Sequence, residues 1–382
     1  MRNFLPARFF AWGILIILLP VGHACMNDED WVEQNKPNLG AEEFQKRGGV
    51  VVVNEGNFMY GNASLTYYDP GTGKLINDIF YRQNGIPLGD VAQSAVIHDG
   101  ELFVVVNNSG KIMVMNAGKY ASLKAFDFTH KITGLPSPRY INFIDSSKAY
   151  ISDLYGKQIS ILDPFSYTVS GKIDIDNHNP DFYQHPSEQF IKFGDEVFTN
   201  CYSYDDKVLV INSKTDRLTD SITVLPQPNS MVLDRYGKIW TLCDGGYKGS
   251  IYDDSLPGLV RIDAMSRTVE KIFLLPDDDW PSKLCINRNA DTLFFINRDV
   301  WRMPVNATAL PQEPFIRANS GTGTRLFYGL GVDPVSSDVY VSDAIDHVQS
   351  GIIYRYSAWG EGIDTFRAGI IPGFFCFVPY YH

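Results

Sequence analysis

Six polar side chains recur at similar points of the sequence and could together form a ligand site. Each one stands at the start of an apolar run, and neighbouring members are 40–54 residues apart. Converging on one axis, such groups could hold a ligand rich in amides through hydrogen bonds. They could equally hold only ordered water. The six residues are Gln93, Arg139, Gln189, Asn229, Lys283 and Tyr328.

Signatures of catalysis are weak. The histidines are scattered, and none has the HxxxH or HExxH spacing of a zinc hydrolase. The sequence also lacks the GxSxG motif of a serine nucleophile. Glu55, Asn229 and Asp343 could hold a divalent cation, and His185 or His347 could coordinate cobalt or another metal, but no motif supports either site. We therefore expect that the protein is not an enzyme and that it has no catalytic residue and no resident metal or cofactor.

An internal repeat predicts the elements that position the six residues. An apolar strand, a tight turn and a second apolar strand recur, as in residues 94–97 and 102–106, which flank the turn at Asp99-Gly100. Third and fourth strands follow in each unit; in this one we expect them at residues 111–115 and 122–126. The first strands begin near Ser94, Tyr140, Gln189, Ser230, Leu284 and Gly329, at intervals of 41–54 residues. Four short strands per unit at this period are the signature of a β-propeller.

A seventh unit opens the domain but lacks its first strand. Residues 49–54, 64–69 and 74–80 supply three strands, and residues 370–378 form a leftover apolar strand at the other end of the chain. We expect the C-terminal strand to complete the first blade, since this closes the ring without an open edge. The prediction is an all-β fold, a seven-bladed β-propeller of four-stranded blades, in a single domain over residues 48–382.

The N-terminus reads as an export signal. Arg2 and Arg8 precede an apolar run over residues 9–21, which is too short to span a bilayer. The sequence Gly22-His23-Ala24-Cys25 resembles a relaxed bacterial lipobox. Residues 1–24 are then a lipoprotein signal peptide and Cys25 is lipidated. The alternative is an ordinary cleaved signal in which Cys25 occurs by chance.

Residues 25–47 are expected to be the lipidated cysteine and a tether. The acidic run at residues 26–30 resembles the surface-export signal of Bacteroidetes lipoproteins, although a solvated linker could be acidic by chance. The protein would be held at the outer membrane through its lipid anchor and exposed at the cell surface.

Composition narrows the range of partners. The net charge of −11 and the pI of about 5.1 argue against nucleic-acid binding, which needs clustered basic residues.

The cysteines favour free thiols. Cys201, Cys243 and Cys285 stand in strand-like runs, which favours free buried thiols over a disulfide framework. The alternative of a single disulfide bridge stays open, because exported proteins meet an oxidising environment.

Long loops on one face of the propeller carry the other candidate binding residues. In this fold the connections between second and third strands share a face with those between blades, around the channel mouth. Here these connections are rich in aromatic, amide and acidic side chains, which suit an amphipathic ligand, although long loops collect such residues anyway. The candidates are Asn57, Phe58, Tyr60, Tyr155, His185, Tyr202, Tyr247 and Trp301.

Three segments carry a family resemblance over nearly the whole mature chain. Residues 52–58 (VVNEGNF), 228–234 (PNSMVLD) and 368–373 (AGIIPG) resemble the YncE-like propeller lipoproteins of Bacteroidetes. That group includes the BtuG surface proteins, which bind vitamin B12 and related corrinoids. The resemblance implies a corrinoid held on the loop face and passed to a TonB-dependent outer-membrane transporter.

Three functions from different classes remain open. The first is capture of a small nutrient, a corrinoid or another molecule, for a membrane transporter. The second is a structural or protein-docking propeller at the cell surface. The third is a metal-dependent hydrolase. The mixed aromatic and polar loops favour nutrient capture over protein docking. The hydrolase is placed last, because the sequence shows no clear ring of basic or metal-ligating residues.

Overall fold

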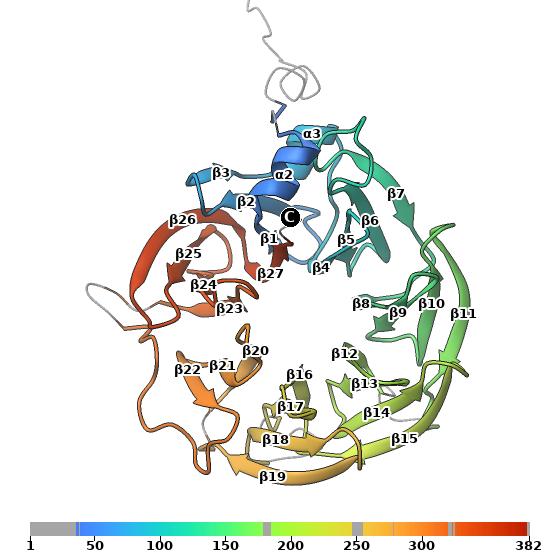
Figure 1. The fold of residues 1–382 in the computed structure, drawn as a ribbon, viewed down its shortest axis with the longest axis vertical. Coiled ribbons are helices and arrows are strands. Elements are labelled where there is room, and N and C mark those ends of the chain that lie inside the picture. Colours follow the sequence, from blue (N-terminus) through green and yellow to red (C-terminus); the bar gives the residue numbers. More distant parts are fainter. Residues whose placement is uncertain are drawn as a thin grey trace, which may run out of the picture.

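The fold is a ring of seven antiparallel sheets (Figure 1), in a computed structural model that describes residues 36–37, 39–178, 185–246, 255–277, 279–319, 323 and 325–379. The prediction of an all-β, seven-bladed β-propeller is confirmed. Within these residues six blades have four strands. The sixth blade has three, with a single bridge between Val300 and Ile316 beside its outer strand.

The blades follow one another along the chain, each from its inner to its outer strand. Blade 1 is β27 (Pro372–Val378), β1 (Gly49–Asn54), β2 (Ser64–Asp69) and β3 (Lys74–Ile76); blade 2 is β4 (Ala92–His98), β5 (Glu101–Val106), β6 (Lys111–Asn116) and β7 (Phe128–Ile132). Blade 3 is β8 (Pro138–Asp145), β9 (Lys148–Asp153), β10 (Gln158–Asp163) and β11 (Thr168–Asp174); blade 4 is β12 (Ser187–Phe193), β13 (Glu196–Cys201), β14 (Lys207–Asn212) and β15 (Arg217–Thr223). Blade 5 is β16 (Pro228–Leu233), β17 (Lys238–Cys243), β18 (Gly258–Asp263) and β19 (Thr268–Leu274); blade 6 is β20 (Ser282–Ile286), β21 (Thr292–Asn297) and β22 (Asp299–Pro304). Blade 7 is β23 (Phe327–Val332), β24 (Val339–Asp343), β25 (Ser350–Tyr356) and β26 (Gly362–Ile370); two short helices, α2 (Ala41–Arg47) and α3 (Ile79–Asn84), lie beside blade 1.

The C-terminal strand closes the ring as predicted. β27 pairs antiparallel with β1, from Gly49 opposite Val378 to Asn54 opposite Pro372. Val50 to Val53 of β1 are fully buried between blades, as expected of a strand with neighbours on both sides and sheets packed on both faces. The edge of β1 is thereby paired, and the ring has no open seam at this point.

Two local predictions were wrong for the same reason: an apolar pattern that serves packing was read as a strand. Residues 74–80 form only the three-residue β3 and then enter α3. Residues 122–126 precede the outer strand of blade 2, which is β7. Phe126 is buried because its ring contacts Phe44 of α2, with 4.9 Å between centroids. The segment predicted as a tether therefore has a folded end, since Phe44 also packs against Tyr67.

The two faces of the ring carry different connections. The loop face carries the connections between blades and those between the second and third strands of each blade. The turn face is the opposite side. The first residue of β1 and the last of β27 pair on the turn face.

No helix among the described residues is long and apolar enough to cross a membrane.

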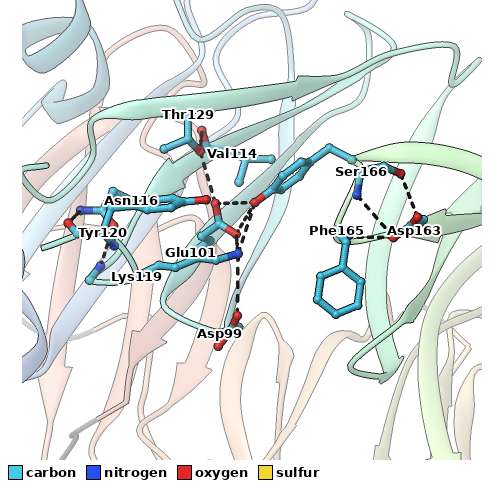
Figure 2. A network of polar contacts seen from close by, with 12 residues as sticks. Asp99, Glu101, Val114, Asn116, Lys119, Tyr120, Thr129, Asp163, Phe165 and Ser166 are labelled. Carbon is cyan, nitrogen blue, oxygen red and sulfur yellow. Dashed lines mark hydrogen bonds and ion pairs between the residues drawn. The ribbon is translucent and has the colours of Figure 1, made fainter. Parts of the chain in front are cut away.

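A buried carboxylate ties blades 2 and 3 together on the turn face. Glu101 contacts Lys119 at 2.7 Å and Thr129 (Figure 2), and the hydroxyl of Tyr167 donates to both oxygens of the same carboxylate. Glu101 is 1% exposed, so these partners offset its desolvation. The network is saturated from within the fold, and we assign it a structural role.

Candidate functional site at the channel mouth

A polar cavity of about 470 Å³ opens at the mouth of the central channel on the loop face. All six of the recurring polar residues line it, together with Tyr202 from the loop between β13 and β14. The structure therefore brings together residues that are 235 positions apart in sequence, from Gln93 to Tyr328. The remaining lining residues are Glu55, Val91, Tyr140, Glu188, Ser230, Asp244, Trp280, Pro281 and Ser282.

Bulges at the start of the inner strands give the cavity its density of polar groups. The pairing register shifts in the first residues of β4, β8, β12, β16, β20 and β23. A bulge breaks the alternation of a strand and redirects side chains. Two consecutive residues can then face the channel, as Arg139 and Tyr140 do in β8 and Glu188 and Gln189 do in β12.

Hydrogen bonds between blades connect the polar side chains of the mouth, and we call the residues that make these contacts the girdle. Arg139 donates to Gln93 of blade 2 and to Glu188 of blade 4, both at 2.7 Å. Gln189 accepts from the backbone of Met231 in blade 5. Three further contacts belong to the girdle: Asn229 to the carbonyl of Pro281 at 2.8 Å, Lys283 to the carbonyl of Gly373 at 3.1 Å, and Tyr328 to Glu55 at 2.8 Å.

The girdle fixes the mouth before any ligand arrives. A Cβ on Gly373 would collide with the Glu55 carboxylate, so glycine at this position leaves the room that Glu55 needs to reach Tyr328. A polar site whose groups are already oriented loses less conformational freedom on binding. The same bonds also hold the blades together, so these side chains have a structural role alongside any part in binding.

The charges at the mouth are nearly balanced and partly desolvated. The side chain of Glu188 is 3% exposed and that of Arg139 18%. Burial raises the pKa of the Glu188 carboxyl, and the Arg139 guanidinium opposes this. Burial also lowers the pKa of Arg139, but the summed attraction of its neighbours, led by Glu188, leaves it raised. Lys283 and Glu55 add one further charge of each sign, and Asp244 adds a third carboxyl, whose pKa burial raises.

Three tyrosines of the cavity stay protonated over the physiological range. Burial, together with the nearby Glu188, raises the pKa of Tyr140 to about 12. Burial and the neighbouring carboxylates of Glu55 and Asp244 raise the pKa of Tyr328 and Tyr202 respectively. The cavity therefore presents neutral hydroxyls beside its amides.

Other predicted residues lie around the mouth without lining the cavity. Phe58 and Tyr60 are 64% and 78% exposed in the loop after β1, and Tyr155 is 53% exposed in the loop after β9. Asn57 donates to the carbonyl of His347 at 2.6 Å and so joins the loops of blades 1 and 7. His185 hydrogen-bonds Asp205 at 2.5 Å beside blade 4.

Trp301 does not line the cavity. The sequence placed Trp301 in a loop, but it lies within β22, packs against the core between blades 5 and 6, and donates to the carbonyl of Asn297. Tyr247 and Cys25 lie outside the described residues, as do the signal peptide and the acidic run.

Comparison with known proteins shows the family of the chain. A family model described as Domain of unknown function (DUF5074) matches residues 48–369. The chain belongs to the DUF5074 family. No curated protein matches the sequence of this DUF5074 protein.

Several solved structures share the fold of the DUF5074 domain. A quinonprotein alcohol dehydrogenase-like protein from Bacteroides thetaiotaomicron is 15% identical with a TM-score of 0.63, covering 87% of this chain and 78% of that one. A candidate 6-phosphogluconolactonase from Bacteroides fragilis is 13% identical with a TM-score of 0.60, covering 87% and 98%. A functionally unknown protein from Desulfotomaculum acetoxidans is 12% identical with a TM-score of 0.60, covering 87% and 99%. At these identities the likeness concerns the fold alone.

One residue of each consecutive channel-facing pair was not among the predicted site residues. Glu188 precedes the predicted Gln189, and Tyr140 and Ser230 follow the predicted Arg139 and Asn229. Strict alternation along a strand would direct these neighbours into the sheet packing. The available signal was the recurrence of two polar or hydroxyl-bearing residues in succession where the inner strand begins. Trp280 and Asp244 come from connections whose path the strand pattern does not determine.

The trio Glu55, Asn229 and Asp343 does not form one site in the DUF5074 domain. Glu55 and Asn229 line the cavity, but Asp343 is not among its lining residues. The Asp343 carboxylate accepts the backbone amides of Leu326 and Ile345 instead. The geometry thus gives no support to the metal-dependent hydrolase.

Asp244 is expected to make the stability of the DUF5074 domain depend on pH. Burial raises its pKa, even though its Oδ1 accepts from Gln227 and Gly246, both at 3.0 Å. When the pKa of a carboxyl is higher in the folded than in the unfolded state, its contribution to stability is fully present at a pH below the unfolded-state pKa. That contribution is lost as the pH rises through the folded-state pKa. Asp244→Asn retains an acceptor oxygen and removes this titration. We expect the variant to be more stable than wild type near pH ~7, and the difference to disappear in acid.

Thermal unfolding of both proteins over a pH series tests this prediction. The quantity to compare is the difference in melting temperature between variant and wild type at each pH. An unchanged difference from acid to neutral pH would show that Asp244 is not destabilised by its ionisation.

Proposed function

We propose that this DUF5074 protein is a non-catalytic, lipid-anchored lipoprotein of the cell surface that binds a corrinoid nutrient at the channel mouth. It then passes the ligand to a TonB-dependent outer-membrane transporter. The observation that carries the proposal is the cavity of about 470 Å³, in which amides, hydroxyls and balanced charges from all seven blades converge. Ligand sites in proteins commonly have volumes of about 300–1,000 Å³.

The chemistry of the lining favours a neutral, amide-bearing ligand. Arg139 and Lys283 face the three carboxyls of Glu55, Glu188 and Asp244, so the lining carries at most one excess negative charge and no strong excess that would select an anion or a cation. Amide and hydroxyl groups donate and accept hydrogen bonds, as the amide arms of a corrinoid do. A buried polar group left without a partner costs about 1–3 kcal/mol, which gives such a site its discrimination.

The size of the cavity assigns different parts of the ligand to different surfaces. A cavity of about 470 Å³ would take an arm of a corrinoid rather than the whole molecule. The flat ring would lie on the rim, where Trp280 is 61% exposed and Phe58, Tyr60 and Tyr155 project from the surrounding loops. Aromatic side chains supply large contact areas at low entropic cost.

The position of the termini agrees with capture from outside the cell. The described chain runs from α2 into β1 on the turn face, opposite the mouth. A lipid anchor at Cys25 would attach on that side, and the tether would leave the mouth directed away from the membrane. Transfer to a transporter would then require reorientation on the tether or a transporter loop that reaches the mouth.

Titration of the soluble chain, residues 27–382, with cyanocobalamin and with cobinamide tests this function. We expect saturable binding at one ligand per chain by calorimetry, with a change in visible absorbance. Absence of heat and of a spectral change at ligand concentrations of about 50 μM, equivalent to a binding free energy weaker than about −6 kcal/mol, would contradict the corrinoid assignment.

One feature favours protein docking as a second candidate. Phe58, Met59 and Tyr60 form a continuous exposed apolar segment, 64%, 78% and 78% exposed, in the loop after β1. Exposed apolar patches often mark protein interfaces. If corrinoids fail to bind, this loop is where a surface partner would be sought. The same segment could contact the transporter in the nutrient-capture function.

A further inference from the structure

Three side chains with different metal-binding atoms converge beside the channel mouth. The ring nitrogen of His185, the sulfur of Cys201 and a carboxylate oxygen of Asp205 all lie within 4.8 Å of one another. Cys201 is fully buried, and the side chains of His185 and Asp205 are only 12% and 8% exposed. This is the only group of three such residues found in the described part of the chain.

The backbone of blade 4 holds these residues in place. Cys201 is the last residue of β13, and Asp205 lies in the loop that follows. His185 stands two residues before β12, and its segment is joined to β13 because the amide of Tyr202 donates to the carbonyl of Pro186 at 3.0 Å. The Asp205 carboxylate is oriented by the amide of Asp206, which donates to Oδ1 at 2.7 Å, while Oδ2 faces His185.

We infer that His185, Cys201 and Asp205 form a zinc site. Zinc bonds of about 2.3 Å to sulfur and about 2.0–2.2 Å to nitrogen or oxygen separate tetrahedral ligand atoms by about 3.3–3.6 Å. Donors within 4.8 Å reach that arrangement by side-chain shifts of about 1 Å. Water would complete the fourth position. The pairing of a thiol and an imidazole selects zinc over calcium or magnesium, which prefer oxygen ligands throughout.

The neighbouring blade shows that a cysteine at this position needs no such partners. Cys243 ends β17 in blade 5 as Cys201 ends β13 in blade 4, and it is equally buried. Cys201 pairs with Ser187 and Cys243 with Pro228, so Pro226 occupies the place that corresponds to His185. Burial of the thiol alone therefore does not account for the histidine and the carboxylate around Cys201.

A bound zinc ion would join the connection before β12 to the loop after β13. Tyr202, which follows Cys201 directly, lines the channel cavity. Zinc would thus stabilise one wall of the mouth. This consequence is separate from the identity of the ligand in the cavity, because the three zinc ligands do not line it.

Titration with Zn²⁺ alone tests the inference, on chain 27–382 without a histidine tag, reduced and stripped of metal. Competition with a chromophoric chelator should show one zinc ion bound per chain. Cys201→Ser should weaken binding at least about tenfold, the loss that corresponds to ~1.4 kcal/mol, and His185→Ala should act in the same direction. Cys243→Ser is the matched control and should bind as wild type does.

Co²⁺ provides a second readout that depends on the thiolate itself. Wild type and Cys243→Ser should show the sulfur-to-cobalt charge-transfer absorption of a tetrahedral site, and Cys201→Ser should lack it. Zinc should also slow alkylation of Cys201 but leave that of Cys243 unchanged. Failure to bind zinc at micromolar concentrations, or equal binding by Cys201→Ser, would overturn the site. Neither measurement involves a corrinoid, so the two proposals fail independently.

Discussion

A chain that ends at Ile370 is expected to lose its cooperative unfolding transition. The deletion removes β27 and leaves the edge of β1 unpaired along Gly49–Asn54. It also removes the buried side chains of Phe375, Cys376 and Val378. Each large apolar side chain contributes about 1.5–3 kcal/mol when buried. The total loss approaches the whole stability of a typical domain, about 5–15 kcal/mol. Circular dichroism during thermal unfolding measures the effect, and aggregation through the free edge should accompany it.

A second truncation separates the closing strand from the extreme C-terminus. A chain that ends at Pro379 lacks only the last three residues and retains all of β27, so it should unfold as the full chain does. A synthetic peptide that spans β27 should restore the transition of the shorter chain when added in trans. A chain ending at Ile370 that unfolded with the wild-type midpoint would show that ring closure does not depend on this strand.

Arg139→Met is expected to destabilise the protein by about 3–5 kcal/mol, because it leaves the buried Glu188 carboxylate without its partner. The two side chains are 2.7 Å apart and mostly shielded from solvent. Chemical denaturation near pH ~7 measures the change. The matched control is Arg317→Met, whose pair with Glu313 is 60% and 77% exposed. Pairs of that kind contribute about 0–1 kcal/mol.

Two further results distinguish loss of the ion pair from loss of packing. The double variant Arg139→Met with Glu188→Leu should recover most of the stability, since apolar replacement of both partners of a buried pair is often neutral. Burial raises the pKa of Glu188, so the deficit of the single variant should shrink as the pH falls and the carboxyl becomes protonated. A deficit that persists in the double variant and does not vary with pH would refute the buried-charge explanation.

The repeat and its closure could be predicted because each blade contains the same local pattern. Alternating strand and turn at residues 94–106 predicted β4 and β5 closely. The missing first strand at residue 49 and the spare strand at residue 370 together required β27 to join β1. The polar residues at the inner strand starts, such as Gln93 and Tyr328, followed from the same pattern, since a propeller brings these starts to one axis.

The rest depended on features that have no fixed period. The bulge at the start of β12 brings Glu188 to the cavity beside Gln189, and strict alternation does not anticipate it. Trp301 was misplaced because blade 6 has a tight connection between β21 and β22 in place of a loop. Some apolar residues pack against distant segments, as Phe126 does against Phe44. In the sequence, such residues give a pattern that resembles a strand. The grouping of His185 with Cys201 and Asp205 likewise required three segments to be placed together.

The most direct test of ligand capture at the mouth compares two exposed tryptophans. Trp280 lines the cavity and is 61% exposed, whereas Trp359 is 82% exposed in the turn between β25 and β26 on the opposite face. Neither belongs to the girdle, so both alanine variants should fold. With cobinamide as the titrant, we expect Trp280→Ala to raise the Kd about tenfold, a loss of ~1.4 kcal/mol, and Trp359→Ala to leave it unchanged. Equal affinities for wild type and both variants would contradict binding at the channel mouth.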